Sequence, residues 1–314
     1  MCMWLIGLAV LAGLVPAPPA DAPLFDRQSD VIYGRKAGLA LTMDVFLPRE
    51  NANGAAVVLV VSGGFFSSNT AINPAFCVPL VRRGYTVFCV VHGSQPTFTV
   101  DQIVPDIHRA VRFIRHHAER WKIDPQRIGI GGGSAGGHLS LMLGVGGGPG
   151  PADAADPVDR ASSAVQAVAC FFPPTDFLNF GEDGRELLGP FPHAPQFRPA
   201  FDHHQLNRAQ NVFDRVTDSD ELRKLARAIS PIYFVSSKSA PTFIIHGDRD
   251  TVVPIQQART FVAKLKEAGV PAELSERPGA AHGWPTILLD VDKLADWFDQ
   301  HLGRPATPPP EHCH

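Results

Sequence analysis

The chain has 314 residues, 45% of them hydrophobic, and a formal net charge of −3 at pH 7. This length and apolar content suffice for one domain with a large core, which we place at residues 23–304. The slightly negative charge argues against a nucleic-acid partner, because such a partner calls for a basic face.

Residues 1–15 form an apolar run that is followed by small residues and prolines. The run is too short for a comfortable transmembrane span and resembles the core of a secretory signal peptide at residues 1–22. We therefore expect export to the periplasm or the extracellular space, with no stable membrane association once the segment is removed. No Lys or Arg precedes the run. Two alternatives therefore stay open: an uncleaved anchor, or a misassigned start and a cytoplasmic protein.

Apolar runs and amphipathic segments alternate along the rest of the chain. The segments 101–121 and 254–268 predict helices, because their apolar residues fall on one stripe. Strands that alternate with helices indicate an α/β fold with a mostly parallel central sheet and helices on both faces. Strands are predicted, the first two as a hairpin, at residues 31–33, 39–46, 56–61, 85–91, 124–131, 165–172, 240–246 and 272–277.

The most informative motif is Gly132–Gly136, which reads Gly-Gly-Ser-Ala-Gly between a predicted strand and a predicted helix. A serine on such a sharp strand-to-helix turn is held in a strained conformation, with its hydroxyl projecting from the sheet. The flanking glycines are expected because side chains there would collide with the neighbouring strand and helix. Ser134 is therefore the predicted nucleophile.

A serine hydroxyl needs a base to take its proton and an acid to orient that base. In this architecture the acid and then the histidine follow the serine along the chain. Asp248 and Asp250 come directly after the apolar run 240–246, and His282 comes after the run 272–277. Loops at the carboxyl ends of parallel strands share one sheet edge, so these residues can meet there.

These motifs resemble the α/β-hydrolase superfamily, in particular serine hydrolases of the esterase/lipase and prolyl-oligopeptidase-like kind, close to acetyl and feruloyl esterases. The resemblance extends over residues 31–302 and rests on the segments 61–65, 132–136, 230–232, 246–250 and 278–283. It implies the α/β-hydrolase fold with Ser134 as nucleophile, Asp250 as acid and His282 as base. Asp248 is the rival acid, but the family pattern favours a role for it in shaping the turn.

An oxyanion hole needs two backbone N–H groups aimed at the developing negative oxygen. We expect one from Ala135 and the other from Gly64 or Phe65, in the loop after the strand 56–61. Relatives often have His-Gly-Gly-Gly in this loop, whereas the present chain has Ser62-Gly63-Gly64-Phe65. The departure removes a side chain that could brace the loop. It leaves the choice of N–H open and predicts modest activity.

Residues 178–229 form an insertion rich in Phe, Pro and His. Either its aromatic residues simply pack onto the domain, or the segment is a cap over the active site. Long irregular insertions above a catalytic face are usually functional, which favours the cap. We expect Phe66, Gly133, Phe180 and Trp284 to contact the substrate, and the many Phe residues indicate an apolar or aromatic group in it.

The predicted function is that of a serine carboxylesterase that hydrolyses small or aromatic carboxylic esters through an acyl-enzyme. Acetyl or feruloyl esters on carbohydrate are the candidate substrates, and no metal or cofactor is expected. The alternatives are a prolyl-oligopeptidase-like peptidase and a catalytically weak binding protein on a hydrolase fold. Cys77 and Cys89 allow a disulfide, although free buried thiols are favoured. The tail 305–314 is predicted to be disordered. The natural ester and the oligomeric state are left open.

Overall fold

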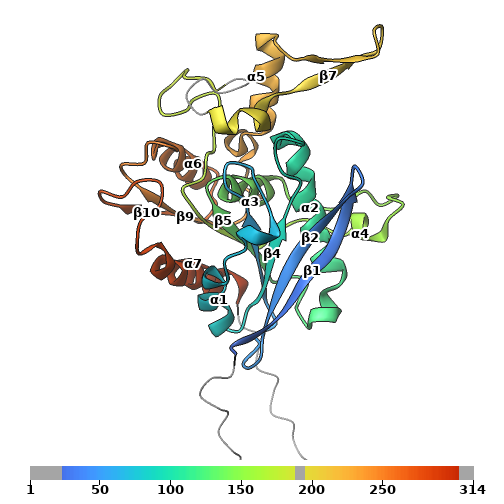
Figure 1. The fold of residues 1–314 in the computed structure, drawn as a ribbon. Coiled ribbons are helices and arrows are strands. Elements are labelled where there is room, and N and C mark those ends of the chain that lie inside the picture. Colours follow the sequence, from blue (N-terminus) through green and yellow to red (C-terminus); the bar gives the residue numbers. More distant parts are fainter. Residues whose placement is uncertain (1–22, 188–194, 304–314) are drawn as a thin grey trace, which may run out of the picture.

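An eight-stranded central sheet is the framework of the fold (Figure 1). A computed structural model of the chain describes residues 23–187 and 195–303, and its strands lie in the order β1-β2-β4-β3-β5-β6-β9-β10. Strands β1 and β2 form an antiparallel hairpin, β2 pairs antiparallel with β4, and the remaining neighbours are parallel. The strands are β1 (Phe25–Lys36), β2 (Leu39–Pro48), β3 (Ala56–Val61), β4 (Thr86–Val91), β5 (Ile128–Gly133), β6 (Ala167–Phe171), β9 (Thr242–Gly247) and β10 (Ala272–Arg277).

Helices cover both faces of this sheet, as predicted. Alternate residues of β4 belong to different hydrophobic clusters, with Phe88 and Val90 in one and Val87 and Cys89 in the other. Since successive side chains of a strand point to opposite faces, the two clusters lie on opposite sides of the sheet. Helices α2, α3 and α6 contribute to the first cluster, and α1 and α7 contribute to the second. The helices are α1 (Val78–Arg82), α2 (Val100–His116), α3 (Ala135–Gly146), α4 (Pro157–Arg160), α5 (Ser219–Ala228), α6 (Gln256–Glu267) and α7 (Ile287–Leu302).

Several predicted boundaries move in the structure, and the strand predicted at 31–33 extends over the whole of β1. The strand predicted at 124–131 starts later, because Arg127 N–H donates to the Asp124 carbonyl at 3.0 Å in a turn that precedes β5. At its other end, strand β5 stops at Gly133, immediately before the predicted nucleophile. The helix predicted at 101–121 ends as an α-helix at His116 and continues as a 3₁₀ turn, Ala118–Trp121.

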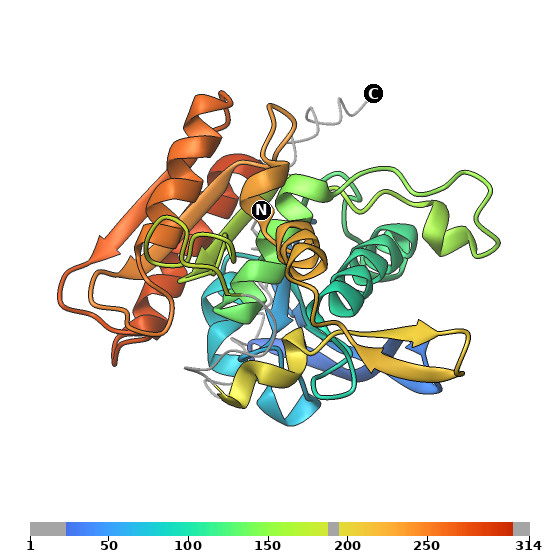
Figure 2. The same ribbon diagram turned by 90° about the horizontal axis from the view of Figure 1, so that it is seen from above.

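The insertion 178–229 lies above the sheet at the top of Figure 1. Its described part holds a 3₁₀ helix (Pro195–Phe201), a hairpin of β7 (His204–Asn207) and β8 (Val212–Arg215), and α5. Seen from above, the hairpin extends away from α6 and β10, toward the side where β1 and β2 lie (Figure 2). The side chain of its Phe213 is 71% exposed to solvent. Phe213 therefore does not line a covered substrate pocket.

The cysteine prediction is settled for the described residues. Cys77, Cys89 and Cys170 are free and buried, and the Sγ atoms of Cys77 and Cys89 lie 3.4 Å apart. Within residues 23–187 and 195–303, no helix is long and apolar enough to cross a bilayer. The predicted signal peptide at 1–22 and the predicted disordered tail at 305–314 lie outside the described residues, so export and cleavage stay predictions.

Candidate active site

Ser134 occupies the sharp turn between β5 and α3. Its backbone has φ +52° and ψ −119°, a strained conformation for a residue with a side chain, and its N–H donates to the Phe171 carbonyl at 2.9 Å. The glycines around it are needed for the reason predicted. A Cβ at Gly136 would lie 2.5 Å from the Val60 carbonyl oxygen, and a Cβ at Gly132 would lie 2.7 Å from the backbone of Gly136. The turn thus presents the hydroxyl at the carboxyl end of the sheet.

Ser134, His282 and Asp250 form one chain of hydrogen bonds, although the sequence separates the first two by 148 positions. His282 Nε2 lies 2.9 Å from Ser134 Oγ, and His282 Nδ1 lies 2.7 Å from Asp250 Oδ2. A carboxylate only accepts hydrogen bonds, so the imidazole carries its proton on Nδ1 and leaves Nε2 free to accept the serine proton. This is the arrangement that makes a serine hydroxyl nucleophilic.

The carboxylate of Asp250 is buried, accepts three hydrogen bonds and lies close to the imidazole of His246, whose Nε2 also lies 2.8 Å from the Val253 carbonyl. Oδ1 accepts the N–H groups of Val252 and Val253 at 2.8 and 2.9 Å, and Oδ2 lies near His282 Nδ1 and 3.2 Å from His246 Nε2. Burial alone would raise the pKa of Asp250, but the hydrogen bonds from His246, His282 and Val253 hold that pKa well below its ordinary value. Asp250 is therefore ionised at neutral pH and can orient His282 as an anion.

Asp248 lies in a turn and contacts the backbone of the next loop. Its carboxylate is exposed and accepts the Gly279 N–H at 2.6 Å, which ties the end of β9 to the loop that carries His282. It makes no hydrogen bond to His282. Between the two aspartates that the sequence left as rivals, the geometry therefore places Asp250 against the histidine.

The loop after β3 makes a tight turn at the predicted oxyanion residues. Gly63 and Phe66 exchange both backbone hydrogen bonds at 3.0 Å, and the two residues between them, Gly64 and Phe65, have φ values of +55° and +66°. Within the described chain, the N–H groups of Gly64 and Phe65 have no backbone acceptor. The N–H of Ala135 opens α3 and lacks a helical partner for the same reason as in any first turn. Donors of the predicted kind are thus available, and the choice between Gly64 and Phe65 stays a prediction.

The side chain of Phe65 holds this turn in place. It is 4% exposed and meets the rings of His138 and Phe201 edge to face, with centroids 5.5 Å away in both cases. A positive φ is costly for a residue with a side chain. The aromatic contacts offset that cost and hold the loop in place.

The four residues predicted to contact substrate lie in different surroundings. Phe66 is 48% exposed on the turn after β3, and Gly133 directly precedes the serine. Phe180 stacks on Phe177 with ring centroids 6.4 Å apart, at the start of the insertion. Trp284 is fixed from both sides, because its ring packs on Phe172 and its Nε1 donates to Asp290 Oδ2 at 2.7 Å. That tie makes Trp284 part of a fixed wall, and substrate contact by all four stays a prediction.

Two residues that contact the triad were not predicted from the sequence. Phe172 packs its ring on His282 with centroids 4.4 Å apart, and His246 is the second imidazole on Asp250. Phe172 sits just past the end of β6, one strand from Ser134 in the sheet. A search of the residues that follow strand ends would have included it. Its contact with the imidazole needs the three-dimensional fold.

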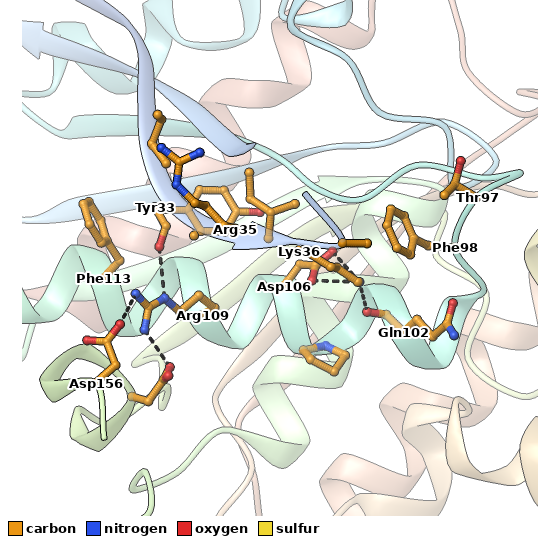
Figure 3. Close-up of a pocket in the computed structure, with 16 residues that line it drawn as sticks. Tyr33, Arg35, Lys36, Thr97, Phe98, Gln102, Asp106, Arg109, Phe113 and Asp156 are labelled. Carbon is orange, nitrogen blue, oxygen red and sulfur yellow. Dashed lines mark hydrogen bonds and ion pairs between the residues drawn. The ribbon is translucent and has the colours of Figure 1, made fainter. Parts of the chain in front are cut away.

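An open hollow of about 1110 Å³ lies away from the triad, between β1 and α2 (Figure 3). It shares no lining residue with the triad. Five of its six charged lining side chains pair with one another, Arg35 being the exception: Lys36 Nζ lies 2.9 Å from Asp106, and Arg109 lies 2.7 Å from Asp156 and 2.9 Å from Asp159. These pairs tie the hairpin and the short helix α4 to α2, which gives these five charges a structural function.

Comparison with known proteins finds one matching family model and relatives that are esterases. The family model BD-FAE matches residues 43–265. The chain is 30% identical over 288 residues to Esterase LipQ of Mycobacterium tuberculosis, covering 87% of this chain and 62% of LipQ. It is 26% identical over 268 residues to the probable carboxylic ester hydrolase LipM of the same organism, covering 84% of this chain and 57% of LipM. The chain thus spans about three fifths of the length of these two relatives.

Solved structures share the fold. A truncated carbohydrate esterase from gut microbiota superposes with a TM-score of 0.72 at 25% identity, covering 90% of this chain and 99% of the other. The propionate-bound esterase Est2 of Thermogutta terrifontis superposes with a TM-score of 0.66 at 23% identity, covering 91% and 97%. The predicted α/β-hydrolase fold is confirmed.

Proposed function

The chain belongs to the BD-FAE family, and from its site we propose that it is a serine carboxylesterase that uses Ser134, His282 and Asp250. The observation that carries the proposal is the hydrogen-bond chain from Ser134 Oγ through His282 to Asp250, with distances of 2.9 and 2.7 Å. The side chain of His282 is 21% exposed, so an ester can reach the imidazole and the hydroxyl from solvent.

The first half-reaction transfers the acyl group to the enzyme. His282 Nε2 takes the proton of Ser134 as the serine oxygen attacks the ester carbonyl, and the N–H of Ala135 with that of Gly64 or Phe65 stabilises the oxyanion. Asp250 stabilises the imidazolium that forms. The tetrahedral intermediate then breaks its bond to the alcohol, which leaves with the proton from His282.

The second half-reaction returns the enzyme to its starting state. Water replaces the alcohol, gives a proton to His282 and attacks the acyl carbonyl. The carboxylic acid leaves as Ser134 regains its proton from the imidazole. Each proton transfer passes through His282 Nε2, which is already in hydrogen-bond contact with Ser134 Oγ.

For the substrate class, we propose an acyl ester on a carbohydrate, of which acetyl and feruloyl esters are the two forms to test. The likeness of this chain to a carbohydrate esterase from gut microbiota supports a sugar-linked ester. Two aromatic residues beside the triad support an apolar acyl group: Phe172 packs on His282, and Trp284 packs on Phe172.

The proposal is tested with p-nitrophenyl esters from acetate to octanoate and purified protein that starts at residue 23. We expect wild-type turnover on at least one ester, and a loss of about 10⁴- to 10⁶-fold in Ser134→Ala, because the nucleophile is gone while the oxyanion donors stay. Equal rates in the two proteins would contradict the proposal. Cleavage of a short proline-containing peptide without ester turnover would instead support the peptidase alternative.

A further inference from the structure

A second cavity, of about 300 Å³, lies between the sheet and the helices α1 and α7, and its lining includes the exposed residues Gly63, Ala71 and Asn73. Figure 1 shows these two helices next to each other on one side of the sheet, and they are in contact. Aliphatic and aromatic side chains such as Leu80, Val291 and Leu294 form most of its wall. Polar side chains come only from Ser62, Asn73 and the thiol of Cys89 among the residues that line it. Such a cavity suits an apolar ligand.

The cavity begins beside the candidate active site. Gly63 and Gly133 line it, and they directly precede the predicted oxyanion residue Gly64 and the nucleophile Ser134. A Cβ at Gly63 would meet no atom within 4 Å, and one at Gly133 would come no closer than 3.5 Å to the ring of Phe172. Neighbouring atoms therefore leave space at both glycines.

The ring of Phe172 is the partition between the triad and the cavity. It lines the cavity and its centroid is 4.4 Å from that of His282. The backbone of Phe172 has φ +36°, which is rare for an aromatic residue and is retained only where the surroundings enforce it. One strained aromatic side chain thus borders both the imidazole and the apolar space behind it.

We propose that this cavity binds the acyl chain of the substrate, an unbranched chain of up to about eight carbons that passes beside Phe172. The inference rests on the proposed esterase function and adds a medium-length acyl chain to the acetyl and feruloyl forms proposed above. A dry apolar cavity of ~150 Å³ is large enough to bind benzene. At about 300 Å³, this cavity has room for roughly twice as many carbon atoms. An acetyl group would leave most of that space unused, whereas an octanoyl chain would bury its methylene groups there.

The test compares two variants with the same change on the same helix. Leu294 lines the cavity and is 3% exposed, whereas Leu289 is 70% exposed and lies outside it. For each protein, kcat/KM is measured on p-nitrophenyl octanoate and on p-nitrophenyl acetate. We expect Leu294→Phe to lower the octanoate-to-acetate ratio about tenfold or more, because one methylene group in an apolar pocket is already worth about that factor. Leu289→Phe keeps the wild-type ratio.

A cavity that does not bind the acyl chain and a protein that is not an esterase give different results. An unchanged ratio in folded Leu294→Phe protein, with acetate still hydrolysed, overturns the inference and leaves the esterase standing. If Leu294→Phe does not fold, Val291→Phe replaces it in the same comparison. If no ester is hydrolysed at all, the thermal midpoint of Ser134→Ala is measured with octanoate and with acetate. Stabilisation by octanoate alone, abolished by the added Leu294→Phe change, supports the cavity as an acyl site, and its absence overturns the inference.

Discussion

Replacing Asp250 with Asn is expected to lower kcat about 10⁴-fold while the protein stays folded. An amide can hydrogen-bond to His282 from either end, so it no longer fixes the proton on Nδ1, and it lacks the charge that stabilises the imidazolium. The donors of His246 and His282 keep Asp250 ionised in the wild type despite its burial, which makes the loss of charge decisive. The measurement is steady-state hydrolysis of the best p-nitrophenyl ester found for the wild type.

Asp248→Asn is the matched control for this prediction. Asp248 lies two residues away, and the amide oxygen of Asn can still accept the Gly279 N–H that the carboxylate accepts at 2.6 Å. Its kcat should stay within about threefold of the wild type, because the residue makes no hydrogen bond to His282. A large loss in Asp248→Asn with little change in Asp250→Asn would reverse the assignment of the acid.

Replacing Gly136 with Ala is expected to destabilise the protein by about 3 kcal/mol or more. The added Cβ would lie 2.5 Å from the carbonyl oxygen of Val60, and the backbone of β3 cannot move aside without breaking its pairing with β5. The thermal midpoint should fall by roughly 6–12 °C, which circular dichroism measures directly.

Gly146→Ala, at the other end of α3, is its control. A Cβ there would meet no atom within 4 Å, and Ala is a better helix former than Gly by up to ~1 kcal/mol. Its thermal midpoint should stay equal or rise slightly. Similar midpoints for the two variants would mean that β3 and α3 are not as closely packed as the structure has them.

The sequence predicted most of the sheet and the triad because both depend on local patterns. Strand β4 is buried along its whole length, as its continuous run of apolar residues indicated. Ser134 and His282 each follow a predicted strand, and the rule that parallel strands end at one edge brings such residues together. The choice of Asp250 over Asp248 came from family resemblance. The spacing alone could not separate two residues that follow the same strand.

What the sequence could not predict depends on contacts between distant segments. The packing of Phe172 on His282 and the burial of Phe65 against Phe201 join residues far apart in the chain. The cavity behind Gly133 is formed by α1 and α7 together with the sheet, and a cavity leaves no mark in hydrophobic periodicity. For the insertion, whose composition suggested a cap, the hairpin extends to one side of the molecule (Figure 2) while Phe201 packs on Phe65 of the loop after β3, and the cap stays a prediction.

Covalent labelling tests whether Ser134 is the nucleophile. An organophosphate such as paraoxon transfers its phosphoryl group to an activated serine and releases p-nitrophenol. We expect peptide mass spectrometry to find one adduct, on Ser134, and ester turnover to fall in proportion to the labelled fraction. His282→Ala should label far more slowly, because the serine then lacks its base. Full labelling of another residue, or complete labelling of Ser134 with ester turnover unchanged, would contradict the assignment of Ser134.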